Sequence, residues 1–403
     1  MLNALQITSV ARFFLGLFQD GGFMDLNEIR DKIDKVDDQI IDLFAQRMEL
    51  SNEVAQYKRA KGIPVIDMTR ERDKRNKIFE KSPKEIREYL PQLYSVVFDL
   101  SRSYQNRLNG VGNELVQNIQ AAIETTPKLF PSNISVACQG CEGANSQIAC
   151  DRLIHGAKIM YFEDFEGVFA AIDTGFCKYG VIPIENSLAG SVNQVYDLMQ
   201  RHQFHIVRSV RQKIDHNLLV KPGVKFEEIR EIYSHPHALS QCSTFLSSLK
   251  NVKALPSQNT AVAAQMVATS ERRDVAALAS RACIKLYGLE CLKPAVQDKD
   301  NNYTRFICIS KDLQIFPGAD RTSLMVSVSH EPGALYKILS RFYALNVNLI
   351  KLESRPLPDR DFEFMFYFDV EASVHDPRFI QLIAELQGVC ESFTYLGSYS
   401  ETI

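Results

Sequence analysis

The chain has 403 residues, of which 45% are hydrophobic and 24% are charged, a composition typical of a globular protein with several packed domains. Its net charge is only −3 and it has no long basic run, so nucleic acid is not expected as a partner. Nine cysteines spread over this length do not form the short, cysteine-dense framework of a secreted protein, so we expect reduced thiols and a cytoplasmic location.

Residues 1–23 are expected to be a disordered N-terminal extension. Their apolar run, 10–18, is interrupted by Arg12 and is shorter than the roughly 20 residues that span a bilayer. No basic region precedes the run and no clear cleavage site follows it, so a signal peptide is not predicted. Anchoring to a membrane surface is a less favoured alternative, and we expect no membrane partner.

Residues 24–112 predict a unit of three helices. Apolar residues recur at three- and four-residue spacing from Ile29 to Phe44, and Gly62 and Pro64 end the first helix. The three helices are expected at about 27–61, 67–82 and 84–108. At 1.5 Å per residue the first would be roughly 50 Å long. Such a helix in so small a unit usually finds its neighbours in another subunit, so we expect a homodimer or higher homo-oligomer.

The rest of the chain shows two further changes in its predicted secondary structure. Residues 113–132 predict a partly helical linker, and 133–313 alternate short apolar strands with helical stretches, which indicates an α/β domain. Residues 320–400 follow the order strand, helix, strand, strand, helix, strand, which is the ferredoxin-like α+β pattern.

Eight polar side chains of the helical unit form a candidate site: Arg30, Arg47, Lys58, Asp67, Arg70, Glu71, Ser101 and Gln105. Arg47 and Lys58 are eleven residues apart, close to three turns, so they share one helix face. Ser101 and Gln105 are one turn apart. Taken singly, most such residues are solvated, and Asp67 also suits a helix N-cap.

As a set with this spacing, these residues resemble the all-helical chorismate mutase family. The resemblance implies an intertwined dimer that rearranges chorismate to prephenate without nucleophile, metal or cofactor. It implies that Arg47 and the partner subunit's Arg30 hold the two carboxylates, because guanidinium binds carboxylate in bidentate fashion. Lys58 and Gln105 would hold the ether oxygen, where negative charge develops. The remaining members would face the ring hydroxyl or complete the pocket: Asp67, Glu71, Arg70 and Ser101.

Polar residues in the α/β domain gather at predicted strand ends and helix starts, where open α/β sheets bind ligands. The stretches are 139–146, 183–193, 234–241, 259–261 and 302–306. Cys138 and Cys141 make a lone CxxC, and His235 and His237 have no further metal-ligand spacing. We therefore predict no metal.

These stretches, above all Pro-Ile-Glu-Asn-Ser at 183–187 and Thr-Arg-Phe at 304–306, resemble the prephenate dehydratase family. The resemblance implies two lobes, like a periplasmic binding protein, with the site in the cleft. Prephenate would lose CO₂ and its ring hydroxyl to give phenylpyruvate, with Thr304 as the donor near that hydroxyl. The proton source stays open.

Other residues of this domain follow from the same resemblance. Glu185, Asn186 and Gln241 would line the cleft. Further prephenate-binding residues would be Ser146, Ser187, Thr260 and Arg305. Arg305 would be either a carboxylate anchor or a structural ion-pair partner. Asn145 stands where the family usually carries an aromatic residue.

Residues 320–400 contain two motifs, Glu331-Pro332-Gly333-Ala334-Leu335 and Leu352-Glu353-Ser354-Arg355-Pro356. The pair resembles the ACT regulatory domain of phenylalanine-controlled dehydratases. The resemblance implies that phenylalanine binds at a dimer interface and favours a less active state. The implied effector residues are Gly333, Ala334, Leu335, Glu353, Ser354, Arg355 and Pro356.

Three alternatives remain. The chain could be a two-lobed sensor whose helices only dimerise, although Thr304 and the polar set argue against this. It could be an enzyme with a single activity, in which the helical unit is only a structural relic of a mutase. A fusion to prephenate dehydrogenase would need a Gly-x-Gly-x-x-Gly after a strand, and Gly140-Cys141-Glu142-Gly143 has the wrong spacing. No cofactor is therefore expected.

Overall fold

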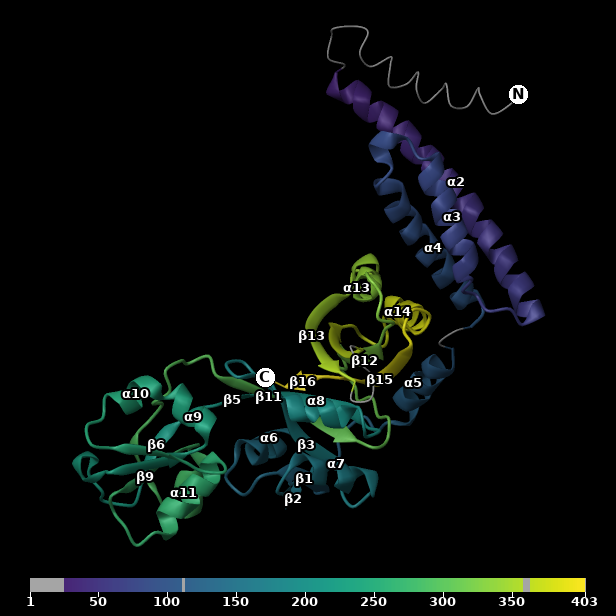
Figure 1. Cartoon of the computed structure of the whole chain (residues 1–403). Coiled ribbons are helices and arrows are strands. Elements are labelled where there is room, and N and C mark those ends of the chain that lie inside the picture. The colour runs from purple at the N-terminus through teal and green to yellow at the C-terminus, as the bar shows by residue number, and fades with distance from the viewer. Residues whose placement is uncertain (1–24, 111–112, 358–362, 403) are drawn as a thin grey trace, which may run out of the picture. The chain divides into compact units, whose positions relative to one another are not determined.

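The computed structural model describes residues 25–110, 113–357 and 363–402, so the expectation for residues 1–23 lies outside the described residues. The chain divides after Asn109 into two compact units, a helical unit and a larger α/β unit (Figure 1). In the described ranges, no helix has the length and apolar character needed to cross a membrane.

Three helices and one 3₁₀ turn make up the helical unit: α2 (Leu26–Lys61), α3 (Met68–Lys81), η1 (Lys84–Ile86) and α4 (Tyr89–Leu108). The predicted end of the first helix is confirmed, because Gly62 takes a left-handed conformation with φ 65°. The predicted start of the second is also confirmed, since the Asp67 side chain accepts from the Arg70 N–H. The third begins at Tyr89 rather than residue 84, because Pro83 leads into the 3₁₀ turn.

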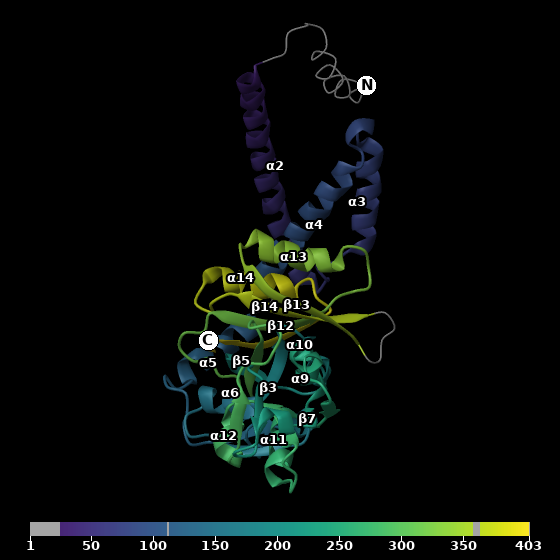
Figure 2. The ribbon, with the colours of Figure 1, turned by 90° about the vertical axis from the view of Figure 1, so that its left-hand side faces the viewer.

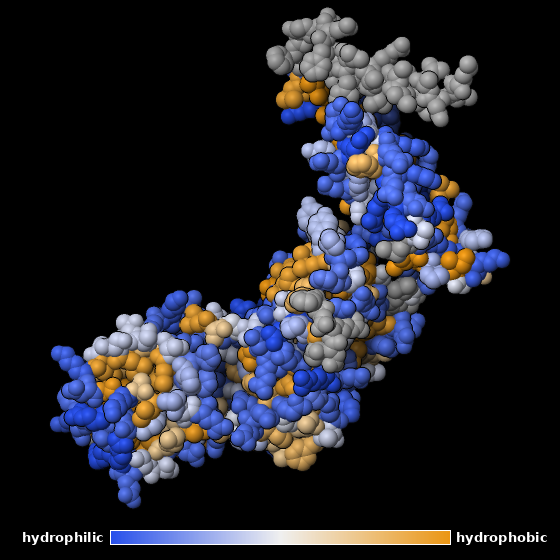
Figure 3. All heavy atoms as spheres, in the orientation of Figure 1, coloured by the Kyte–Doolittle hydropathy of each residue, from blue (hydrophilic) through white to orange (hydrophobic). Residues whose placement is uncertain are grey.

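One long face of α2 is apolar and uncovered in the helical unit. Ile40, Leu43 and Tyr57 are 57%, 64% and 63% exposed, and further apolar side chains extend the same stripe in both directions. Figure 3 shows apolar side chains open on the visible surface of this unit. Among the described residues up to Asn109, the buried apolar side chains are Ala55, Ile78 and Phe98. Such a small core does not explain a helix of 36 residues.

The first lobe of the α/β unit surrounds a mixed sheet with the order β16-β5-β11-β3-β1-β2, and β4 pairs with β3. Its strands are β1 (Ser135–Gln139), β2 (Lys158–Phe162), β3 (Tyr179–Asn186), β4 (Gly190–Ser191), β5 (His205–Lys213), β11 (Tyr303–Ser310) and β16 (Glu401–Thr402). Its helices are α6 (Asn145–Leu153), α7 (Phe165–Asp173) and α8 (Asn193–Met199).

The second lobe has its own sheet in the order β10-β6-β9-β7-β8. Its strands are β6 (Asn217–Val220), β7 (Glu231–Ser234), β8 (Lys253–Pro256), β9 (Val275–Ala279) and β10 (Glu290–Lys293). Its helices are η2 (Phe226–Glu228), α9 (Pro236–Gln241), α10 (Ser243–Ser247), α11 (Thr260–Thr269) and α12 (Ala282–Tyr287). The chain passes between the lobes twice, after β5 and before β11, and we call these two stretches the hinge segments.

The C-terminal sheet is antiparallel, with the order β13-β14-β12-β15. Its elements are β12 (Arg321–Ser327), α13 (Ala334–Ala344), β13 (Asn348–Pro356), β14 (Phe364–Glu371), α14 (Pro377–Gln387) and β15 (Ser392–Tyr399). On one face Phe368 and Val370 pack with α13 and α14, and with Ile119 of α5 (Asn113–Thr125). The segment expected to be a linker therefore contains a helix packed into this core.

The opposite face of the C-terminal sheet packs on the first lobe (Figure 2). Tyr367 of β14 contacts Tyr196 of α8 edge to face, with ring centroids 5.1 Å apart. The chain then returns to the first lobe, where β16 pairs in parallel with β5. Gly397 allows this close approach: its φ is 136°, and an added Cβ would lie 2.3 Å from the Ile206 carbonyl oxygen. The C-terminal sheet is thus joined to the strand that flanks β11.

Candidate functional site

The end of β3 and the start of β11 form the centre of the candidate site. In this antiparallel pair Thr304 lies opposite Asn186, and Arg305 lies opposite Glu185. Successive side chains of a strand point to opposite faces. Asn186 and Thr304 therefore share one face of the sheet, and Glu185 and Arg305 share the other.

The Asn186 amide has only one possible orientation. Its Oδ1 accepts from the backbone N–H groups of Leu188 (3.0 Å) and Ala189 (2.9 Å). Its Nδ2 must therefore donate, and it lies 2.9 Å from Thr304 Oγ1 and 2.8 Å from Asn302 Oδ1. Because Thr304 Oγ1 accepts this bond, its own hydrogen is available to another acceptor, and no residue in the described part of the chain takes it.

A second free donor lies beside the first. Gln241, at the end of α9, accepts through Oε1 from Asn302 Nδ2 and His216 Nε2, both at 2.9 Å. Its own Nε2 has no hydrogen-bond partner among the described residues. The lobes thus meet where two donors, the Thr304 hydroxyl and the Gln241 amide, await an acceptor.

Ser187 has a structural position next to this group. Its Oγ donates to the Asn301 carbonyl at 2.7 Å and accepts from the Tyr303 N–H at 2.9 Å. It therefore holds the second hinge segment against the end of β3.

Two other expected prephenate residues lie at helix starts. Ser146 is buried in the first turn of α6, and Thr260 begins α11 in the second lobe. The loop before α6 reaches across the lobes, since Ser280 Oγ donates to the Gly143 carbonyl at 3.1 Å. The hydrogen-bonded residues at the lobe junction are Asn186, His216, Gln241, Asn302 and Thr304, which we call the Thr304 group. Within the described ranges, neither Ser146 nor Thr260 is hydrogen-bonded to this group through its side chain.

The expectation that Glu185 lines the cleft is not what the structure shows. Its carboxylate lies 2.8 Å from Arg305 Nε and accepts from Lys351 Nζ of β13 at 2.7 Å. Strand alternation turns it to the face opposite Thr304, toward the C-terminal sheet.

Arg305 takes the second of its two predicted roles, that of an ion-pair partner. It is 3% exposed and also pairs with the fully buried Asp369 of β14. Burial is the largest single effect on this guanidinium and lowers its pKa, but the neighbouring acidic groups, Asp369 first among them, together outweigh burial and the pKa is raised. A guanidinium held in this way is not free to bind a substrate carboxylate.

The expected effector residues fall into two places. Ala334 and Leu335 line a pocket of about 130 Å³ together with Phe364 and Phe366, and Gly333 caps α13 beside it. The residues 353–356 lie on β13: Ser354 and Pro356 are exposed, whereas the other two side chains reach the first lobe.

Those two side chains bind residues of β4 and α8. Glu353 accepts from Ser191, and Arg355 forms a bidentate pair with Asp197 at 2.9 Å for both bonds. They connect the C-terminal sheet to the lobe and do not line the pocket beside α13.

In the helical unit, α2 and α4 bring Arg47 and Ser101 together by a hydrogen bond, and Arg47 Nη1 also donates to the Val97 carbonyl at 3.3 Å. Burial lowers the pKa of Arg47. Gln105 lies one turn farther along α4, buried, and its Oε1 has no partner in the described chain. An unpaired buried acceptor of this kind indicates a polar group supplied from elsewhere.

The remaining members of this set are spread out. Lys58 Nζ donates to the Val65 carbonyl at 2.7 Å, Asp67 caps α3, and Arg30 and Arg70 are exposed. Glu71 pairs with Arg102, a residue that the sequence did not single out because no local spacing connects α3 with α4. Arg30 has no contact with Arg47 in this chain.

Metal ligation finds no support in the described ranges, where no group of three or more His, Cys, Asp or Glu could hold an ion. All nine cysteines are unpaired, including Cys138 and Cys141 of the CxxC stretch.

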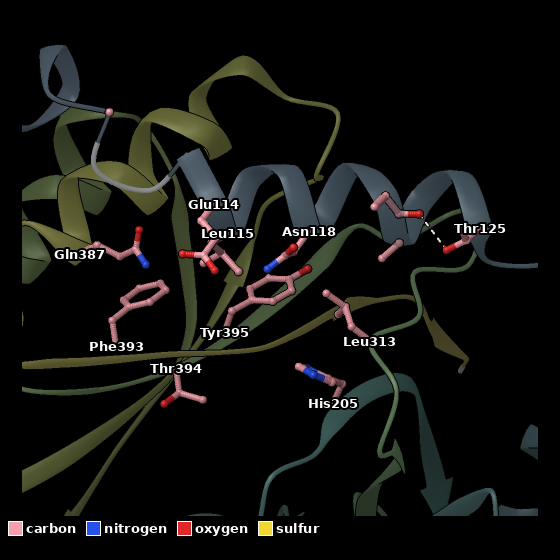
Figure 4. Close-up of a pocket in the computed structure, with 13 residues that line it drawn as sticks. Glu114, Leu115, Asn118, Thr125, His205, Leu313, Gln387, Phe393, Thr394 and Tyr395 are labelled. Atoms are coloured by element: carbon pink, nitrogen blue, oxygen red, sulfur yellow. Dashed lines mark hydrogen bonds between the residues drawn. The ribbon is translucent and has the colours of Figure 1, made fainter.

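A separate hollow of about 950 Å³ lies between α5 and β15 (Figure 4). Its wall includes Asn118 and Thr125 of α5, His205 of β5 and Tyr395 of β15. It shares no residue with the Thr304 group, so it is not a candidate for the same chemistry.

Comparisons with known proteins identify both catalytic domains. Residues 29–106 match the chorismate mutase type II family, and residues 136–314 match the prephenate dehydratase family. The bifunctional chorismate mutase/prephenate dehydratase of Escherichia coli is 30% identical over 379 residues, covering 92% of this chain and 95% of that protein. The chain belongs to the family of bifunctional chorismate mutase/prephenate dehydratases. Both enzyme activities predicted from the sequence are thereby confirmed.

Two further relatives each cover 66% of this chain. Arogenate dehydratase/prephenate dehydratase 1 of Arabidopsis thaliana is 37% identical over 285 residues, which is 66% of this chain and 72% of that protein. The crystal structure of prephenate dehydratase from Arthrobacter aurescens, in complex with L-Phe, is 27% identical with a TM-score of 0.61, covering 66% of this chain and 90% of that one.

The Arg305 ion pairs generate a stability prediction. Arg305→Met should destabilise the dehydratase part by about 3 kcal/mol or more, because it leaves Asp369 buried without its cation. Calorimetric unfolding of the full chain measures this. Arg272→Met is the matched control, since Arg272 also pairs with two carboxylates but lies on the surface, and it should change little. Equal, small effects of both substitutions would contradict the buried-pair interpretation.

Proposed function

We propose that the chain makes phenylpyruvate from chorismate in two steps and that phenylalanine restrains the second step through the C-terminal sheet. The mutase would occupy 24–112, and the dehydratase 133–313, joined by 113–132 and followed by a regulatory domain at 320–400. The matched ranges, 29–106 and 136–314, support the two catalytic assignments. The observation that carries the proposal is the pair of free donors, Thr304 and Gln241, at the junction of the lobes.

Dehydration requires departure of the ring hydroxyl as CO₂ leaves and the ring becomes aromatic. A donor placed at that oxygen stabilises the negative charge that develops on it. The Thr304 hydroxyl suits this role because Asn186 donates to its oxygen and so leaves its hydrogen free. The hydroxide still needs one proton to leave as water, and Thr304 does not supply it, being a weak acid.

The mutase step is a rearrangement that requires a compressed conformer and positive charge near the breaking ether bond. Arg47 would bind one carboxylate, Lys58 and Gln105 the ether oxygen, and the partner subunit's Arg30 the other carboxylate. The exposed apolar face of α2 supports an intertwined dimer, because a second copy would bury it. The assembly would then be a homodimer or a higher homo-oligomer.

The C-terminal sheet would be an ACT domain of ferredoxin-like fold. Its strand order and its two helices on one face support this. Phenylalanine would bind beside Gly333–Leu335, and the relative from Arthrobacter aurescens has been crystallised with L-Phe. Its effect would pass through Lys351 and Glu353 to the back of β3, since an effector acts by binding two conformations unequally.

The cellular location proposed for the enzyme is the cytoplasm. All nine cysteines are unpaired, as expected in a reducing compartment.

Replacing Thr304 tests the dehydratase proposal. Thr304→Val keeps the side-chain shape but removes the donor, so kcat for prephenate should fall about 100-fold. Thr304→Ser keeps the hydroxyl and should retain most of the activity. The mutase rate of the same samples is the internal control and should not change. A Thr304→Val enzyme whose kcat for prephenate equals that of the parent would contradict the assignment of Thr304.

Mixed dimers test the delivery of Arg30 from the partner subunit. Arg30→Ala and Arg47→Ala subunits should each be nearly inactive as mutases, because each lacks one carboxylate ligand. Co-expressed, they should regain mutase activity, since one site of each mixed dimer has both arginines.

The matched control for this test co-expresses Arg47→Ala with Lys58→Ala. Both residues belong to the same subunit's site, so no complete site can form and activity should stay low. Failure of the Arg30 and Arg47 pair to regain activity, with mixed dimers demonstrated, would contradict the intertwined arrangement.

A further inference from the structure

Two buried residues of the hinge segments belong to the Thr304 group, yet no role follows for them from the family resemblance. His216 follows β5 in the first hinge segment and is 4% exposed. Asn302 precedes β11 in the second and is fully buried. Both donate to the same atom, Gln241 Oε1 of the second lobe, at 2.9 Å. The Gln241 amide is therefore held from both hinge segments.

The direction of each hydrogen bond in this group follows from the backbone. Since Asn186 Nδ2 must donate, Asn302 accepts through Oδ1 and turns its Nδ2 toward Gln241. Gln241 then receives this bond on Oε1. His216 can only donate to the same oxygen, so it carries its hydrogen on Nε2.

We propose that His216 is a positioning residue for dehydration: its Nε2–H fixes the Gln241 amide so that Gln241 Nε2 faces prephenate as a donor beside the Thr304 hydroxyl. The proposal rests on the roles of Thr304 and Gln241 given above. With Asn302 alone holding Oε1, the Gln241 amide has more freedom to rotate. A rotated amide would present oxygen to the substrate and a second donor to Asn302 Nδ2.

The surroundings suit a neutral, fixed imidazole. Burial is the main cause that lowers the pKa of His216, and the bond to Gln241 only partly offsets it. The backbone N–H of His216 donates to Gln297 Oε1 at 3.0 Å, and Gln297 Nε2 donates to Asp215 Oδ1 at 3.1 Å. The hinge backbone is thus fixed independently of the ring.

A matched pair of substitutions isolates the Nε2–H. His216→Phe keeps a ring but has no donor, whereas His216→Gln keeps an N–H at similar reach. His216→Phe should lower dehydratase kcat about tenfold, the loss expected for one hydrogen bond that orients a donor, with KM nearly unchanged. His216→Gln should retain most of the parent's dehydratase kcat. Mutase activity of both variants should equal that of the parent. Unchanged kcat in His216→Phe would overturn the proposal.

A double variant separates positioning from simple loss of structure. If His216 acts through the Thr304 group, adding His216→Phe to a Thr304→Val chain should lower dehydratase kcat by less than about twofold, because the effects of coupled residues are not additive. An equal fall in both backgrounds would overturn the proposal. Failure of the Thr304 assignment itself would show differently, as full activity of Thr304→Val alone.

The unmutated protein gives a test that does not depend on how the variants fold. Nitrogen NMR of the full chain, labelled at histidine, distinguishes the two neutral tautomers. The proposal requires hydrogen on Nε2 of His216 at neutral pH. Hydrogen on Nδ1 would overturn it, because Nε2 could not then donate to Gln241.

Discussion

The antiparallel pairing of β3 with β11 is the constraint on which both the site and its regulation depend. One register places Thr304 opposite Asn186 and Arg305 opposite Glu185. A shift of β11 by one residue would exchange the faces of Thr304 and Arg305, so neither would remain beside its present partner on β3. The front of the pair therefore carries hydrogen-bond donors for a substrate, and the back carries charges that meet the C-terminal sheet.

The back face of the β3–β11 pair explains why the first lobe and the C-terminal sheet form one compact body. Arg305 joins Glu185 of β3 to Asp369 of β14, and Lys351 reaches the same Glu185 from β13. A buried network of this kind is costly when broken, so it fixes the C-terminal sheet in one position. Any movement of that sheet acts on the strand next to Thr304, which gives an effector a short physical route to the site.

The sequence predicted much of this, but not the direction of side chains. Periodicity and capping residues placed the first two helices correctly, because Gly62 and Asp67 act locally. The family resemblance singled out Asn186, Gln241 and Thr304, which the structure brings into one hydrogen-bonded group through Asn302. It also placed Glu185 in the cleft, and only the register of β3 against β11 shows otherwise. The packing of α5 and the role of Arg102 depend on contacts distant in sequence, which no local pattern encodes.

The most direct test of the two-faced strand pair is the dehydratase activity of Glu185→Gln measured with and without phenylalanine. The account predicts kcat within about threefold of the parent, because Glu185 does not touch the substrate. It also predicts weaker inhibition by phenylalanine, because Lys351 loses the nearer of its two charged partners. A loss of kcat as large as that of Thr304→Val, with inhibition unchanged, would place Glu185 in the cleft and contradict the account.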